Sequence, residues 1–231
     1  MQKKFEILMI CCLFASAFFL ARAGAAFVSA KTAEKTRNCI VLDAGHGGSD
    51  PGKVGCNDIL EKDINLSIVY KLKTLFENKG FKVVLTRTDD KPLADDNAKN
   101  MKIEDMRNRV ALITETMPIM TISIHQNSFP DASISGPQVF FYDQSPEGKV
   151  IAATLQNTLN TIMDPPKPRM SKSNDDYYIL KKTPTPTVIV ECGFLSNPTE
   201  ASLLSATEYQ EKIVYALSTG ILEYLKSNDY M

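Results

Sequence analysis

The sequence is poor in cysteine and histidine and carries no excess of positive charge. Lys and Arg number 26 against 27 Asp and Glu, which gives a formal net charge of −1 at pH 7. Residues 1–23 contribute three basic residues and one acidic residue, so the chain without them has a net charge of −3. This balance excludes the polycationic surface that binds nucleic acid, and it offers no electrostatic attraction to an anionic membrane.

The cysteine content excludes a scaffold held together by disulfides. Of the five cysteines, Cys39, Cys56 and Cys192 follow residue 23. An odd number allows at most one internal disulfide. Cys39 and Cys192 lie in strand-like runs, where we expect buried thiols.

The N-terminus has the layout of a secretory signal. Lys3 and Lys4 precede an apolar run over residues 7–20, and Ala21-Arg22-Ala23 is the expected cleavage box. The run is short for a membrane-spanning helix. We therefore expect residues 1–23 to be a signal peptide, with a retained membrane anchor as the alternative, and residues 24–37 to be a tether. Either alternative predicts export across the cytoplasmic membrane, with the protein secreted or membrane-anchored.

Residues 38–231 are long enough for one domain with a sizeable core, and they contain no internal repeat. Apolar runs and helical spacing alternate along them. This alternation predicts an α/β three-layer sandwich, in which a central, mostly parallel sheet has helices on both faces. The strands are expected at about residues 38–43, 81–86, 119–125, 136–142, 177–181 and 187–191.

Four ionisable side chains stand at the ends of these elements. His46 follows the first strand inside a glycine-rich loop, and His125 ends the third strand. Glu61 stands where a helical pattern begins, and Glu191 ends the last apolar run. A buried carboxylate is costly unless it is paired or bound to a cation. Taken alone, a histidine at a strand end is more often structural, but the four residues together predict a metal site.

The donor types point to one zinc ion. His46, Glu61 and His125 would supply three nitrogen and oxygen ligands, which leaves a position open for water. Glu191 would act as the general base, so the set supports metal-assisted amide hydrolysis. Asp43 and Asn127 are candidates to orient the two imidazoles, and capping of loop backbone is their alternative role.

Four ordered blocks carry a family resemblance. Leu42-Asp43-Ala44-Gly45-His46-Gly47-Gly48, Leu60-Glu61-Lys62-Asp63, Ser123-Ile124-His125-Gln126-Asn127 and the stretch from Val190 to Asn197 resemble the signature blocks of the zinc-dependent N-acetylmuramoyl-L-alanine amidases. The resemblance implies a mixed six-stranded sheet. It also implies zinc on His46, Glu61 and His125, catalysis by Glu191, and cleavage of the bond between N-acetylmuramic acid and L-alanine in peptidoglycan.

Within this family the chain is most similar to the spore-cortex amidases. That similarity implies a role in forming muramic-δ-lactam together with a muramic acid deacetylase, in the forespore intermembrane space. Wall-binding repeats and a long blocking insertion are not found in the sequence. We therefore expect a separate extracytoplasmic protein to recruit or activate the domain.

Several alternatives remain at this stage. A general autolytic amidase or another extracytoplasmic zinc peptidase would use the same ligand types. A carboxypeptidase would also need a cation for the terminal carboxylate, for which Arg87, Arg107, Arg109 and Arg169 are candidates, although exposed arginines are the default expectation. A non-catalytic peptidoglycan-binding module is a further alternative, against which the retention of all four acid and histidine positions counts. A nucleophilic Cys192 is disfavoured because the neighbouring Glu191 would raise the pKa of its thiol.

Overall fold

The structure, a computed structural model, describes residues 9, 16–20, 22, 38–95 and 97–231. The predicted signal peptide or anchor (residues 1–23) falls mostly outside these residues, and the predicted tether (24–37) falls wholly outside them. Among the described residues, none of the helices combines the length and the apolar character needed to cross a bilayer. Residues Asn38–Met231 form one compact unit.

Six strands form one mixed sheet in the order β2-β1-β3-β6-β4-β5. Strands β2, β1, β3 and β6 run parallel, whereas β4 is antiparallel to β6, and β5 is parallel to β4. The strands are β1 (Cys39–Ala44), β2 (Lys82–Leu85), β3 (Met120–Asn127), β4 (Gln138–Phe141), β5 (Lys172–Ser173) and β6 (Thr187–Phe194). The predicted mostly parallel, mixed six-stranded sheet is confirmed.

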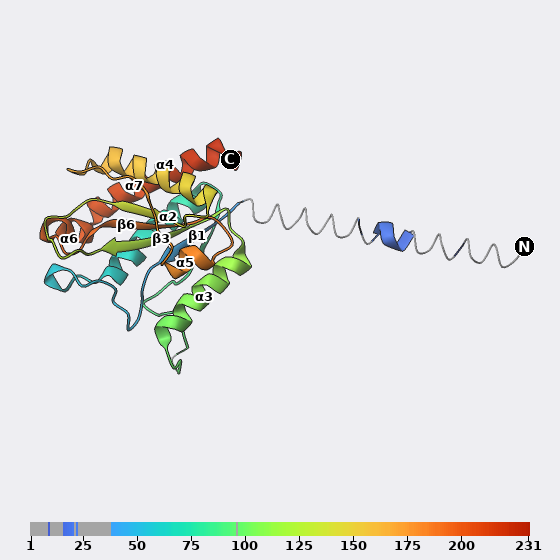
Figure 1. Ribbon diagram of the computed structural model, residues 1–231, viewed down its shortest axis with the longest axis horizontal. Coiled ribbons are helices and arrows are strands. Elements are labelled where there is room, and N and C mark those ends of the chain that lie inside the picture. The colour runs from blue at the N-terminus through green and yellow to red at the C-terminus, as the bar shows by residue number, and fades with distance from the viewer. Residues whose placement is uncertain (1–8, 10–15, 21, 23–37, 96) are drawn as a thin grey trace, which may run out of the picture. The chain divides into compact units, whose positions relative to one another are not determined.

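Helices cover both faces of this sheet (Figure 1). The larger core lies between one face and three long helices, α2 (Glu61–Asn78), α4 (Pro146–Met163) and α7 (Thr207–Ser227). The shorter α6 (Pro198–Ser205) packs against α7 and β6 on that side. The other face packs against α3 (Met101–Thr116) and α5 (Tyr178–Lys182). A single 3-10 turn, η1 (Cys56–Asp58), interrupts the loop between β1 and α2.

The alternation of strand side chains decides which face receives the polar residues. In β1, Ile40, Leu42 and Ala44 belong to the larger core, whereas Val41 belongs to the smaller one. Because successive side chains point to opposite faces, Asp43 shares the α3/α5 face with Val41. The register aligns Asp43 with Ser123, and His125 with Glu191. The carboxyl ends of the parallel strands therefore deliver polar side chains to the α3/α5 side of the sheet.

Two local predictions are wrong. Residues 177–181, expected as a strand, are mostly the helix α5, in which the adjacent Ile179 and Leu180 are both buried. The Asn174 side chain accepts hydrogen bonds from the backbone N–H of Asp176 and Tyr177, and this Asx turn leads the chain into the helix. The strand β5 lies in the loop that follows α4, where no strand was expected from the sequence.

The cysteine predictions agree with the structure. Cys39, Cys56 and Cys192 are free thiols, and Cys39 and Cys192 are buried. Burial raises the pKa of the Cys192 thiol far above its ordinary value, so its sulfur stays protonated and is not a nucleophile.

Candidate metal centre

His46 owes its position to an unusual backbone. It has a left-handed φ of 65°, which is uncommon for a residue other than glycine. Gly52 lies against it with a φ of 70°, and a Cβ at Gly52 would come within 2.5 Å of Glu61 Oε2 and 2.7 Å of His46 Cδ2. The glycine-rich loop therefore makes room for the side chains of the site.

Gly45 makes room for the second histidine. A Cβ at this position would lie 2.1 Å from Cε1 of His125, so only glycine leaves space for the imidazole ring. The space beside Gly45 in the glycine-rich loop is thus occupied by a candidate metal ligand.

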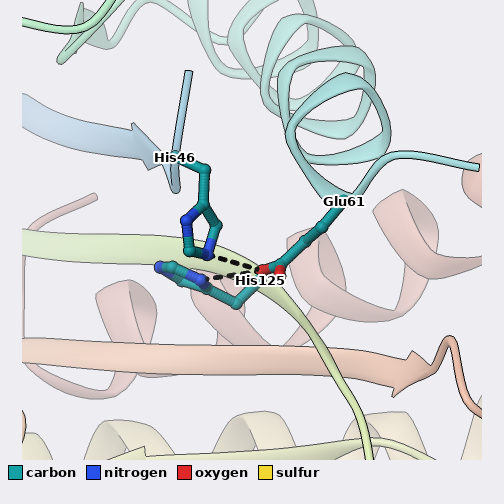
Figure 2. A group of neighbouring side chains, drawn as sticks. All are labelled: His46, Glu61 and His125. Carbon is teal, nitrogen blue, oxygen red and sulfur yellow. Dashed lines mark hydrogen bonds and ion pairs between the residues drawn. The ribbon is translucent and has the colours of Figure 1, made fainter. Parts of the chain in front are cut away.

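The three predicted ligands converge on one point (Figure 2). His46 comes from the loop after β1, Glu61 from the first turn of α2, and His125 from β3. Glu61 Oε1 lies 3.2 Å from Nε2 of His46 and 3.0 Å from Nδ1 of His125. One donor atom from each residue lies within 4.8 Å of the other two.

The polar contacts among His46, Glu61 and His125 are those expected around a bound cation. Besides the two imidazole nitrogens, Glu61 Oε1 receives the backbone N–H of Gln126 at 3.0 Å and the Asn65 amide at 3.4 Å. His46 faces carboxylates with both nitrogens, because its Nδ1 lies 3.0 Å from Asp50 Oδ2. A neutral imidazole has only one N–H. Without a second proton or a metal ion, one of these nitrogens would turn a lone pair towards a carboxylate oxygen.

The Glu61 carboxylate is ionised. Burial alone would favour its neutral form, but the hydrogen bonds from His125 and His46 outweigh burial and hold its pKa below the ordinary range. The other oxygen, Oε2, accepts the backbone N–H of Lys53 at 2.7 Å. Glu61 is thus a fixed negative charge with one oxygen facing the two histidines.

Asp50 orients His46, and sequence analysis missed it. Its Oδ2 lies 3.0 Å from Nδ1 of His46, and in the tautomer with the proton on Nδ1 this contact leaves Nε2 as the free ligand nitrogen. Partial burial opposes ionisation of Asp50, but the hydrogen bond from His46 lowers its pKa. The only signal in the sequence was an acid four residues after His46 in the same loop.

The two predicted orienting residues make other contacts. The Asp43 carboxylate accepts hydrogen bonds from Ser123 at 2.5 Å, Thr86 at 2.7 Å and Arg109 at 2.6 Å. Asn127 caps the backbone N–H of Ser128 at 2.8 Å, which is the alternative that the sequence left open for it. Asp43 acts on His125 through its charge, since the two side chains share one face of the sheet.

Glu191 stands beside His125 in the register of β3 and β6. Its side chain is buried, and Oε2 has no hydrogen-bond partner among the described residues. Burial raises the pKa of this carboxyl to about 7, although the charge of His125 opposes the rise. A carboxylate with a pKa near neutrality and a free oxygen is suited to accept and return a proton.

A cavity of about 480 Å³ joins these residues. The two histidines, Glu61 and Glu191 lie on its walls, together with Met106 from α3 and with Tyr177 and Tyr178 at the start of α5. Tyr177 packs edge-on against Phe140, with ring centroids 5.6 Å apart. The site thus opens into a mixed polar and aromatic cleft on the α3/α5 side of the sheet.

Two of the arginines expected to be exposed are buried. Arg87 is 4% and Arg109 is 1% exposed. Both guanidinium groups donate to backbone carbonyls of the β1 strand end, and Arg109 also pairs with Asp43 and Asp105. Neither is free to hold the terminal carboxylate of a peptide substrate.

Comparison with known proteins shows which family the chain resembles. Residues 40–223 match the family model described as N-acetylmuramoyl-L-alanine amidase. The germination-specific N-acetylmuramoyl-L-alanine amidase of Bacillus subtilis (strain 168) is 37% identical over 188 residues, which are 80% of this chain and 78% of the relative.

Solved structures agree with this placement. The CwlD amidase from Clostridioides difficile, solved in complex with the GerS lipoprotein, aligns with a TM-score of 0.79 at 39% identity, over 82% of this chain and 99% of that one. The amidase AmiC2 of Nostoc punctiforme aligns with a TM-score of 0.72 at 30% identity, over 82% of this chain and 98% of that one. The predicted family and the similarity to CwlD are confirmed: this chain belongs to the N-acetylmuramoyl-L-alanine amidase family.

Proposed function

We propose that this protein is a zinc hydrolase that cleaves the amide between N-acetylmuramic acid and the L-alanine of the peptidoglycan stem peptide. The observation that carries the proposal is the convergence of His46, Glu61 and His125 next to a buried Glu191 with a free oxygen. Membership of the amidase family supports the choice of bond.

Each residue has a distinct task in this proposal. His46 through Nε2, Glu61 through Oε1 and His125 through Nδ1 would hold one zinc ion. When bound, such an ion would supply Lewis-acid chemistry, which polarises a carbonyl and makes water more acidic.

The proton transfers belong to Glu191. Its free Oε2 takes a proton from the attacking water and then returns it to the leaving amine of L-alanine. A pKa of about 7 suits both halves of this cycle, since the group gains and loses a proton near neutral pH. Asp50 keeps His46 in the tautomer that leaves Nε2 free.

We further propose a role in the spore cortex. Support comes from the germination-specific Bacillus subtilis relative and from the CwlD structure. In this role the amidase removes stem peptides so that a muramic acid deacetylase can complete muramic-δ-lactam. In this proposal residues 1–23 export or anchor the protein, residues 24–37 tether it, and the catalytic domain works in the forespore intermembrane space. A general autolytic amidase is the alternative role.

We also propose an extracytoplasmic protein partner. The CwlD amidase was solved in complex with a lipoprotein, GerS. A partner of that kind would supply the wall targeting for which the sequence shows no repeats.

Substitution of Glu191 by glutamine tests the catalytic assignment. The variant keeps the shape of the side chain but loses the proton acceptor, so amide cleavage should fall by at least a hundredfold. Bound zinc, measured by atomic absorption, should stay at the wild-type level. Glu77→Gln, on the exposed face of α2, is the matched control and should retain activity. Wild-type turnover by Glu191→Gln would rule out Glu191 as the base.

A further inference from the structure

Two buried guanidinium groups hold three successive backbone carbonyls at the end of β1. The carbonyl of Ala44 accepts from Nε of Arg87 at 2.9 Å and from Nη1 of Arg109 at 2.7 Å. The carbonyl of Gly45 accepts from Nη2 of Arg87 at 3.2 Å, and that of His46 accepts from Nη2 of Arg109 at 2.7 Å. We call this set of contacts the arginine clamp.

Arg109 is itself fixed from behind. Its Nε donates to Asp105 at 2.7 Å, and its Nη1 donates to Asp43 at 2.6 Å. Asp105 and Arg109 are one turn apart on α3, and Asp43 lies on β1. The guanidinium therefore links α3 rigidly to the carbonyl of His46.

Arg87 is bonded differently. Among the described residues, its guanidinium donates only to backbone carbonyls, which are those of Ala44, Gly45, Lys62 and Asp89. Burial lowers the pKa of Arg87, and the charge of Arg109 lowers it further. The two neighbouring buried cations repel each other, and replacement of buried ionic groups by well-packed apolar side chains is often neutral or stabilising. The arrangement therefore calls for a reason other than stability.

The backbone of His46 provides that reason. Its left-handed φ of 65° is unfavourable for a side chain with a Cβ and persists only where the surroundings impose it. The clamp fixes the carbonyl of Gly45, which belongs to the Gly45–His46 peptide, and the carbonyls of Ala44 and His46 on either side of it. If these bonds were lost, rotation of the backbone towards negative φ would carry the imidazole away from Glu61.

We propose that Arg87 and Arg109 are positioning residues that set the zinc affinity by imposing the backbone conformation of His46. The inference rests on the metal site of the proposed function. It assigns the affinity to two side chains that do not touch the ion, and it predicts that their geometry matters and not their charge alone.

Lysine substitutions test this proposal. Arg87→Lys and Arg109→Lys keep the positive charge but lose the fork of donors that spans two carbonyls. Zinc dissociation constants are measured for each purified variant by competition with a chromophoric chelator. Each variant should bind zinc about 10- to 100-fold more weakly than the wild type, the range expected when support for a ligand is removed.

Two controls separate positioning from general loosening of the fold. Arg169→Lys removes an arginine that donates to the backbone carbonyl of Ser135 and to none of the carbonyls in the clamp. This variant should leave the zinc affinity unchanged. Ile113→Val loosens the core beneath α3 without touching the clamp, and it should lower the melting temperature of the zinc-free protein but not the affinity for zinc.

The outcomes are distinguishable. A wild-type protein that binds no zinc would overturn the proposed metal site itself. Wild-type zinc affinity in both lysine variants would overturn the clamp alone. If Arg109→Lys does not fold, Arg87→Lys decides, because that side chain has no direct carboxylate partner among the described residues. The proposal would also be overturned if Ile113→Val weakened zinc binding as much as the lysine variants do at an equal loss of melting temperature.

Discussion

Replacement of Gly45 by alanine isolates the contribution of His125 to the site. The φ of Gly45 is outside the left-handed region, so alanine meets no backbone penalty there. Its Cβ would lie 2.1 Å from Cε1, 2.4 Å from Nε2 and 2.6 Å from Nδ1 of His125. Carbon atoms not bonded to each other approach to about 3.5 Å, so the imidazole must move away from Glu61.

The magnitude follows from the loss of one ligand. A four-ligand structural zinc site binds with about 10–16 kcal/mol, or about 3 kcal/mol per ligand. Displacement of His125 from a three-ligand site should therefore weaken zinc binding by about a hundredfold. Stability of the zinc-free protein should change little, because the ring can turn into the cavity that it already lines.

Gly80 is the matched control for this experiment. It has a left-handed φ of 86° and no atom within 4 Å of an added Cβ. Alanine at Gly80 therefore strains the backbone but meets no side chain, whereas alanine at Gly45 meets a side chain without backbone strain. Gly80→Ala should cost about 1 kcal/mol of stability and leave zinc affinity unchanged. Chelator competition and urea unfolding of both variants give the two quantities. Wild-type zinc affinity in Gly45→Ala would refute the assignment of His125 as a ligand.

Three further predictions concern two acids beside the site and one helix cap away from it. Asp50→Asn should weaken zinc binding by about 10- to 100-fold, because the amide no longer fixes the His46 tautomer, and isothermal titration calorimetry measures the change. Asp43 has a pKa of about 2 against an ordinary 3.8, so its ionisation adds about 2 kcal/mol of stability above pH 4, which is lost as the pH falls towards 2. Urea midpoints between pH 6 and pH 3 should therefore fall less steeply in Asp43→Asn than in the wild type, and parallel profiles would contradict this. Ser145→Ala removes the cap on the N–H of Gly148 and should cost about 1 kcal/mol in urea unfolding without any change in zinc binding.

Five of the six strands, and the convergence of the four ionisable side chains at the ends of their elements, could be predicted from the sequence because both depend on local pattern. A parallel sheet places its carboxyl ends at one edge, so side chains at strand ends meet without knowledge of the detailed packing. His125 and Glu191 are direct neighbours in the register for this reason. The predicted roles of His46, Glu61, His125 and Glu191 remain proposals until a metal and a product are measured.

The supporting residues could not be predicted, because their roles depend on backbone conformation and on packing between distant segments. Asp50 meets His46 only because the loop between them turns through left-handed φ at His46 and at Gly48. Arg87 and Arg109 look like surface charges in the sequence. They become buried because β2 and α3 bring them to the end of β1, 43 and 65 positions away from the carbonyl of Ala44. The helix α5 was missed because its five residues are too few to show a periodicity.

Mass spectrometry of muropeptides tests the central claim most directly. Residues 24–231 are incubated with cortex-type peptidoglycan in the presence of zinc, and in parallel with a chelator. The account predicts zinc-dependent release of whole stem peptides, with the muramic acid left free of L-alanine. Release of single amino acids would assign a carboxypeptidase instead, and full release of stem peptides in the presence of the chelator would contradict the metal site.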